Sequence, residues 1–217
     1  MSRTITVKGT GRVSLSPDLT AVTMTLDTVD KNYDRAMERS AALLDGLREA
    51  LAAVGFDKKE LKTTSFNVST RYEGQRDSDG NYRNVFVGYA CVHGLMLEFD
   101  FDTKRLSAVL SAIARCVAEP SLNVRFTVRD QEAAADALLQ SAAENARHKA
   151  EVLAAASGVK LGELLSVNYS WGELNVYSDT DYCVEEKCMA MPMRAAMDLT
   201  PDDIELSDTA TFVWEIA

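Results

Sequence analysis

The sequence has little of what several large protein classes require. Its 217 residues include only four cysteines, four prolines and two histidines. No apolar run approaches the roughly 18 residues that a membrane-spanning helix needs. Four cysteines are also too few for a scaffold held together by disulfides. These absences exclude a helical membrane protein and a small disulfide-rich domain.

Clusters of basic residues are absent as well. The chain has 23 Lys and Arg against 33 Asp and Glu, a formal net charge of -10. A surface of that charge repels the phosphates of nucleic acids unless one face is locally basic, so we expect no nucleic-acid partner. Apolar residues, in contrast, make up 47% of the chain. That content is enough to bury a core and excludes overall disorder.

The beginning of the chain bears on its location. Residues Met1–Gly11 show no basic segment followed by an apolar stretch, which is the pattern of a signal peptide. As written, the sequence predicts a cytoplasmic protein. A periplasmic or secreted location is the alternative if a leader has been removed.

Alternation of apolar and polar residues predicts several strands. The first runs from Ile5 to Leu15, with Gly9 and Gly11 on its apolar side, where glycine indicates close packing. The turn Ser16-Pro17-Asp18 predicts that this strand pairs antiparallel with the next one. The other expected strands are Val22–Leu26, Leu61–Tyr72, Val85–Phe99, Val124–Val128, Leu164–Trp171 and Ile204–Ile216, with Asp79-Gly80 as a hairpin turn.

Helical spacing occurs in three stretches. Residues 33–54 form the first, with Asn32 as its N-cap. Asp102 is expected to cap a second helix, which Pro120 ends, and Asp130 a third helix that reaches Ser157. The third helix has an inner stripe of mostly small side chains that would allow close approach: Ala135, Leu138, Ala142, Ala146, Ala150 and Leu153.

The order of these elements predicts an α+β fold. We expect a largely antiparallel sheet with three helices packed on one face and two interleaved lobes. Residues 1–217 should form a single domain, because no low-complexity linker divides them. Gly172–Thr200 has few periodic signals and is expected to be a long loop.

Catalytic motifs are not found. Gly9-x-Gly11 lies inside a strand pattern and lacks the third glycine of a dinucleotide-binding turn. Neighbouring carboxylates such as Asp202 and Asp203 face apart in a strand-entry turn. A nucleophile elbow and a Walker loop are missing, and His93 and His148 lack the spacing of zinc ligands. We therefore expect a protein that is not an enzyme and holds no cofactor.

One cluster is chemically unusual, the run Cys-Met-Ala-Met-Pro-Met at residues 188–193. Methionine adapts to irregular contacts, so the first interpretation is a subunit interface formed by Met189, Met191, Met193 and Met197. Thiolates and thioethers also suit Cu(I). The alternative is therefore a copper or redox site formed by Cys183, Cys188, Met189, Met191 and Met193. Two alternatives are open for Cys183 and Cys188 in an oxidising compartment: a disulfide between them, or two free thiols.

Four stretches, in this order, resemble one family: Ile5–Gly11 with Ser16-Pro17-Asp18, Gly88-Tyr89, Ala146–Ala154 with Gly158, and Pro192–Leu206 with Phe212. They are similar to the SIMPL domain family (domain of unknown function 541), which includes the bacterial periplasmic 26 kDa immunogenic protein. The chain departs from the family pattern at Pro201-Asp202, where Pro-Gly is usual.

The resemblance implies an α+β fold and a tendency to self-assemble, with some relatives forming large ring or channel-like oligomers. It implies no established catalytic activity and no agreed site. The resulting hypothesis is a non-enzymatic protein that acts as a homo-oligomer or through a protein partner, with stress response as its setting.

Overall fold

The computed structural model describes residues 3–76, 82–169, 174–184 and 200–217. Within these residues it confirms the α+β class, with three helices and eight strands. The strands form two antiparallel sheets instead of the single sheet that was expected. The expected turn Asp79-Gly80 and the strand end at Trp171 lie outside the described residues.

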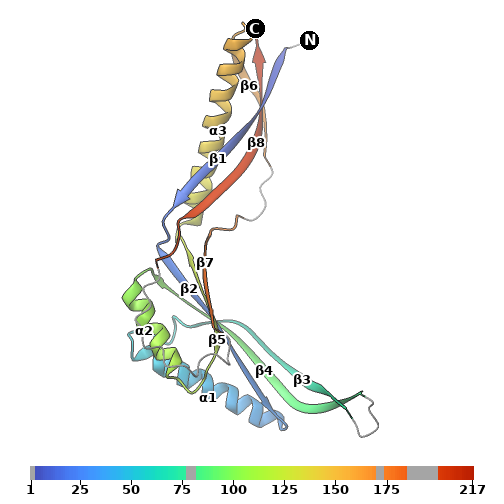
Figure 1. The fold of residues 1–217 in the computed structure, drawn as a ribbon, viewed down its shortest axis with the longest axis vertical. Helices are drawn as coiled ribbons and strands as arrows, with labels where there is room; N and C mark the ends of the chain where they lie inside the picture. The colour runs from blue at the N-terminus through green and yellow to red at the C-terminus, as the bar shows by residue number, and fades with distance from the viewer. Residues whose placement is uncertain (1–2, 77–81, 170–173, 185–199) are drawn as a thin grey trace. The chain divides into compact units, whose positions relative to one another are not determined.

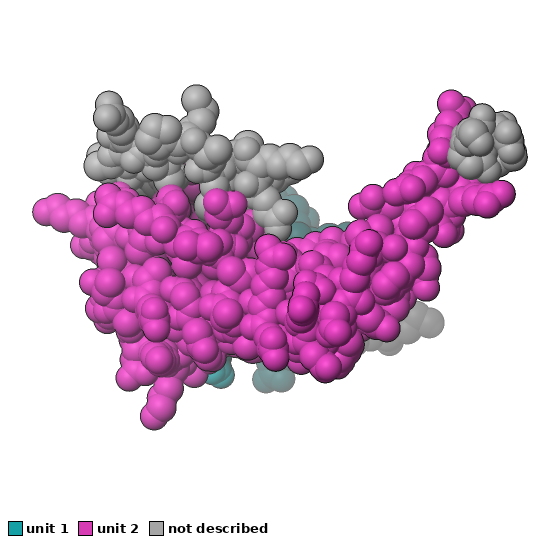
Figure 2. All heavy atoms as spheres, turned by 90° about the horizontal axis from the view of Figure 1, so that it is seen from below, with its two compact units in different colours: residues 1–18, 127–179, 201–217 teal, residues 19–126, 180–200 magenta. Residues whose placement is uncertain are grey.

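The chain divides into two compact units, each built from separate stretches of sequence. Unit 1 contains residues 1–18, 127–179 and 201–217, and unit 2 contains residues 19–126 and 180–200 (Figure 2). The units are described one at a time below.

Unit 1 is a three-stranded sheet covered by one helix. β1 (Thr4–Leu15) pairs along its whole length with β8 (Ile204–Ile216), and β6 (Leu161–Asn168) lies on the other side of β8. The helix α3 (Gln131–Ala156) runs along β1 and β8 (Figure 1). Asp130 caps this helix as predicted, because its side chain accepts a hydrogen bond from the backbone N–H of Ala133 at 2.8 Å.

The contact between helix and sheet in unit 1 is unusually close. A Cβ atom added to Gly9 would lie 2.1 Å from the carbonyl oxygen of Ala142 and 2.7 Å from Cβ of Ala146. One added to Gly11 would lie 2.3 Å from the carbonyl oxygen of Leu138. The prediction that these two glycines mark close packing is confirmed.

The buried stripe of α3 differs from the predicted one at both ends. Its members follow strict four-residue steps: Ala134, Leu138, Ala142, Ala146, Ala150 and Ala154. The predicted end members were wrong, since Ala135 is half-buried and Leu153 is 47% exposed. Four-residue steps exceed one helical turn by about 40°. The stripe therefore winds around the helix and follows the twist of the sheet below it.

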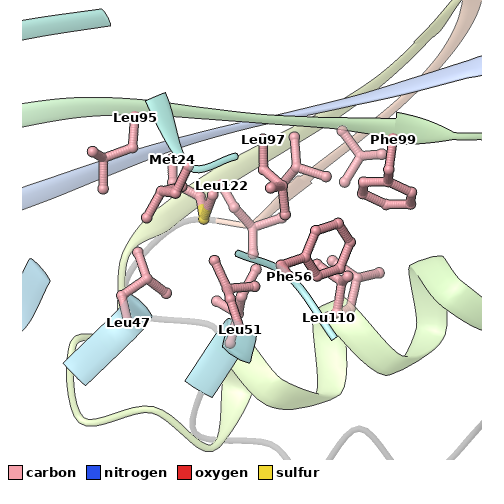
Figure 3. Packing of buried hydrophobic residues seen from close by; sticks show 14 of the residues in the cluster. Met24, Leu47, Leu51, Phe56, Leu95, Leu97, Phe99, Leu110 and Leu122 are labelled. Carbon is pink, nitrogen blue, oxygen red and sulfur yellow. The ribbon is translucent and has the colours of Figure 1, made fainter. Parts of the chain in front are cut away.

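The five-stranded sheet has the order β3-β4-β2-β5-β7, with most of its residues in unit 2. Its strands are β2 (Leu19–Asp30), β3 (Lys62–Arg76), β4 (Tyr82–Asp100), β5 (Ser121–Thr127) and β7 (Tyr177–Val184). The helices α1 (Tyr33–Ala52) and α2 (Thr103–Ala114) pack against it. Figure 3 shows Leu47, Leu51 and Leu110 from these helices facing the side of the sheet that carries Leu95, Leu97 and Phe99 of β4.

The predicted caps of α1 and α2 are confirmed, whereas the expectation that Pro120 ends the second helix was wrong. The Asn32 side chain accepts hydrogen bonds from the backbone of Asp34 and Arg35, and Asp102 accepts one from Arg105. Gly55 follows α1 with a positive φ of 94°, which glycine adopts without strain. α2 ends at Ala114, well before Pro120, so the helix stops without the proline.

Two expectations about connectivity were wrong. β1 does not pair with β2, because the turn between them bonds elsewhere: the Asp18 N–H donates to the Thr127 carbonyl at 3.1 Å, and Asp18 Oδ1 accepts from the Arg129 N–H at 2.7 Å. The segment 172–200 is not entirely loop, since it contains β7. β7 was missed because its less exposed side consists of Ser178, Thr180 and Tyr182, which give no apolar alternation.

Candidate functional site

The most distinctive surface of unit 2 is the end of the β3–β4 hairpin. β2 pairs with β4 only from Asp100 back to Tyr89, so the earlier part of β4 has β3 as its neighbour. We call this two-stranded part the ribbon; it consists of Arg71–Arg76 and Tyr82–Gly88. Figure 2 shows it as a narrow projection from unit 2. An isolated two-stranded ribbon is only marginally stable in water.

Gly88 lies where the ribbon leaves the sheet. A Cβ atom at this position would lie 2.5 Å from the carbonyl oxygen of Asp30, the last residue of β2. A shift in the pairing register follows at once, between Arg71 and Tyr72. Across the same junction, Arg71 Nη2 donates to Asp27 Oδ2 at 2.6 Å. The motif Gly88-Tyr89 therefore forms the base of the ribbon, where only glycine leaves room for the end of β2.

Aromatic side chains run from α1 onto the ribbon in edge-to-face contacts. Ring centroids lie 5.5 Å apart for Tyr33 and Tyr89, 5.5 Å for Tyr89 and Phe86, and 5.7 Å for Phe86 and Tyr72. Such pairs favour fixed ring positions. At the far end, the guanidinium of Arg76 lies 5.2 Å from the ring centroid of Tyr82.

These side chains are exposed to solvent to an unusual degree. Tyr82 is 74% exposed and Tyr72 55%, and Val85 and Phe86 are exposed as well. No residue of β3 is buried. A group of large apolar side chains around a narrow projection is typical of a protein contact surface. The sequence pattern predicts strands at Tyr72 and Phe86 but gives no signal of this surface, because the exposure of the two side chains follows from where β2 ends.

A second apolar surface of unit 2 lies between α1 and α2. It is a groove of about 880 Å³ whose walls carry mostly small side chains, such as Ala42, Gly46 and Ala112. Val117 at its rim is 89% exposed. Glu49 and Arg115 are its charged members.

The two histidines occupy different surroundings. His93 on β4 is buried, with Nε2 3.0 Å from Oγ1 of Thr63 and its ring 5.0 Å from that of Phe66. Burial lowers the pKa of His93 below the usual 6.5, and the charge of Arg48 lowers it further. His148 is exposed on α3. Within the described residues, no three side chains of His, Cys, Asp or Glu are grouped as metal ligands.

The cysteine and methionine cluster is described only in part. Cys183 lies exposed on β7, with its Sγ 3.7 Å from Oδ2 of Asp181. The other members, Cys188, Met189, Met191, Met193 and Met197, lie outside the described residues. Their proposed role in an interface or a copper site therefore stays a prediction.

The two adjacent carboxylates, Asp202 and Asp203, are both exposed just before β8. Asp203 Oδ1 accepts a hydrogen bond from Ser16 Oγ at 2.8 Å, and the Asp202 carbonyl accepts one from Ser178 Oγ at 2.7 Å. These two bonds connect the start of β8 to Ser16 and to Ser178 of β7. No described helix is long and apolar enough to cross a membrane.

Comparison with known proteins gives a family match over nearly the whole length. A profile of the SIMPL family, described as a protein of unknown function (DUF541), matches residues 5–214. No curated protein matches. Matching solved structures include the crystal structure of an uncharacterized conserved protein from Listeria innocua, 9% identical, with 96% of this chain and 92% of that chain covered and a TM-score of 0.19.

Proposed function

The chain belongs to the SIMPL family, whose function is unknown, and from that premise we propose that it is a non-enzymatic binding protein that acts through self-association. The observation that carries this proposal is the ribbon, because its aromatic side chains reach into solvent without the support of a third strand. Covering them would remove apolar area from water, at about 25 cal/mol per Å².

The test is the solution mass, measured by light scattering. Replacing Tyr72, Tyr82 and Phe86 together with Ser should lower the assembled mass and leave the secondary structure of the chain unchanged. Val152→Ser, which removes an exposed apolar side chain of α3 outside the ribbon, is the matched control and should have no effect. An unchanged mass in the ribbon variant would show that association does not use this surface.

Residues 188–197 are a second proposed contact, on sequence grounds alone. Replacing Met189, Met191 and Met193 with Ser should also lower the mass if methionines adapt to a partner surface. The rival function, copper binding by Cys183, Cys188 and these methionines, predicts stoichiometric copper in protein purified without chelator and its loss in the same variant. Copper at that stoichiometry would replace the interface proposal for this segment.

Stress response remains the proposed setting. A strain that lacks the gene should survive stress less well, and the ribbon variant should fail to restore survival. Replacing both His93 and His148 with Asn should leave survival intact, because neither histidine belongs to a group of metal ligands in the described residues. Loss of survival in a folded, normally associated double variant would favour an enzyme.

A further inference from the structure

The two edge strands of the sheet in unit 1 differ in how their outward-pointing backbone groups are bonded. Along the edge formed by β1, side chains from α3 at one-turn intervals bond the backbone groups that point away from β8. Ser141 Oγ accepts from the Arg12 N–H at 3.1 Å and donates to the Arg12 carbonyl at 3.2 Å. The Thr10 N–H donates to Asn145 Oδ1 at 3.0 Å. Lys149 Nζ donates to the Lys8 carbonyl at 3.1 Å. These four bonds occupy most of the backbone groups that this edge turns outward over Lys8–Arg12.

The opposite edge, formed by β6, has no such cover among the described residues. β8 is the strand paired with it there, and no bond from a described side chain to the backbone of Leu161–Asn168 is seen. Of its eight residues only Leu161 is half-buried; the rest are exposed. An uncovered strand edge is a template for pairing with another strand.

The composition of β6 favours pairing. Leu164 and Leu165 are each 50% exposed and Val167 is 45% exposed. Proline and lysine, which usually prevent edge pairing, do not occur in β6. Its protective features are the irregular register against β8, between Leu161 and Ser166, and the single charge of Glu163.

The charge along this edge indicates what would pair with it. Over residues 160–168 the single lysine, Lys160, balances the single carboxylate, Glu163. The whole chain carries a net charge of -10, so two copies repel each other over most of their surface. A neutral, apolar strand edge is where two copies can approach at least electrostatic cost. An antiparallel pair of identical strands is also self-complementary about a two-fold axis.

We propose that the open edge of β6 pairs antiparallel with β6 of a second copy, which joins the two three-stranded sheets into one. This inference deepens the proposed function, since it rests on self-association, but it assigns a surface separate from the ribbon. Leu165 is the fifth of the eight residues, so the two copies of Leu165 lie near the two-fold axis. Charges introduced there would face each other.

The experiment is a charge swap at that position. Leu165→Lys and Leu165→Glu, each studied alone, should lower the assembled mass to about half or less, because like charges meet at the axis. An equimolar mixture of the two variants should recover the mass of the unchanged protein. Thr6→Lys and Thr6→Glu, at an exposed position of β1 in the same sheet, are the matched controls and should leave the mass unchanged alone and mixed.

Each outcome decides the proposal. Unchanged mass in both Leu165 variants overturns it, and so does a loss that mixing fails to restore, which would show that Leu165 faces a different segment of the second copy. If mass is lost in the ribbon variant and kept in the Leu165 variants, this inference falls and the proposed function stands. A monomer at all concentrations overturns both.

Hydrogen exchange of the unchanged protein is the second measurement: amides 161–168 should exchange faster on dilution, and equal rates at all concentrations would overturn the pairing.

Discussion

The two units bury their apolar surface in opposite ways. In unit 2, large side chains fill the space between helices and sheet, among them Met24, Leu97 and Phe126, all fully buried. In unit 1, much of the contact between helix and sheet is alanine on glycine, as Ala142 and Ala146 press against Gly9. From this difference we expect smaller side chains to destabilise unit 2 most and larger side chains to destabilise unit 1 most.

The largest expected effect comes from shrinking a side chain in unit 2. Phe126 is fully buried and lies edge-to-face with Phe101, with 5.5 Å between ring centroids. Phe126→Ala should reduce the free energy of unfolding by about 3–5 kcal/mol, because the lost contacts leave a cavity. The measurement is denaturant unfolding. Phe86→Ala, on the exposed ribbon, is the matched control and should cost clearly less; equal losses would contradict this account of the core.

The next effect comes from enlarging a side chain in unit 1. Ala146 is fully buried, and its Cβ already limits what fits at Gly9. Ala146→Leu should lower the free energy of unfolding by about 1–3 kcal/mol through overpacking. Ala143→Leu, at an exposed position of the same helix, is the control and should be close to neutral. If the two variants unfold alike, the close contact does not limit the stability of unit 1.

The contrast between the units also explains what could be predicted from sequence. Helix caps depend on residues three positions apart, and Asn32, Asp102 and Asp130 all act as predicted. The stripe of small side chains on α3 was also predicted, because its members repeat within a single helix. Strand partners, however, are set by contacts across the chain: β1 pairs with β8 so that Thr4 lies opposite Glu215. No local pattern specifies such a pairing, and the Pro17-Asp18 turn indicated the wrong one.

The candidate site shows the same limit. Tyr72 and Phe86 lay in predicted strands, but their exposure requires that β2 end at Asp30 while β4 continues. The edge of β6 looked like an ordinary strand as well, since the side chains that cover the other edge come from Ser141 and Asn145, more than 125 residues from their partners in β1. Local periodicity shows which residues form strands and leaves open which edges stay uncovered.

A smaller effect is expected where α3 covers the β1 edge. Asn145→Ala removes the acceptor of the Thr10 N–H, a partly buried bond. The loss should be about 1 kcal/mol in the free energy of unfolding, the usual net value of such a bond. Glu144→Ala, one residue away and exposed, is the control. A loss no greater than that of the control would show that water replaces the amide, and that the covered edge differs little from the open one.

The smallest effect is a pH dependence confined to unit 2. Burial, with a further contribution from Arg48, holds the pKa of folded His93 below 6.5, the value expected for the unfolded chain. As the pH falls through 6.5, the unfolded chain therefore takes up a proton before the folded one, and the free energy of unfolding decreases. The slope from one such group is at most about 1.4 kcal/mol per pH unit.

His93→Gln, whose amide can still reach Thr63, should flatten the decrease between about pH 6.5 and pH 5, above the range where most carboxylates titrate. His148→Gln, on the exposed face of α3 in unit 1, should leave the decrease in place. Denaturant unfolding at a series of pH values measures both variants, and an unchanged slope in His93→Gln would show that this buried histidine does not couple the stability of unit 2 to pH.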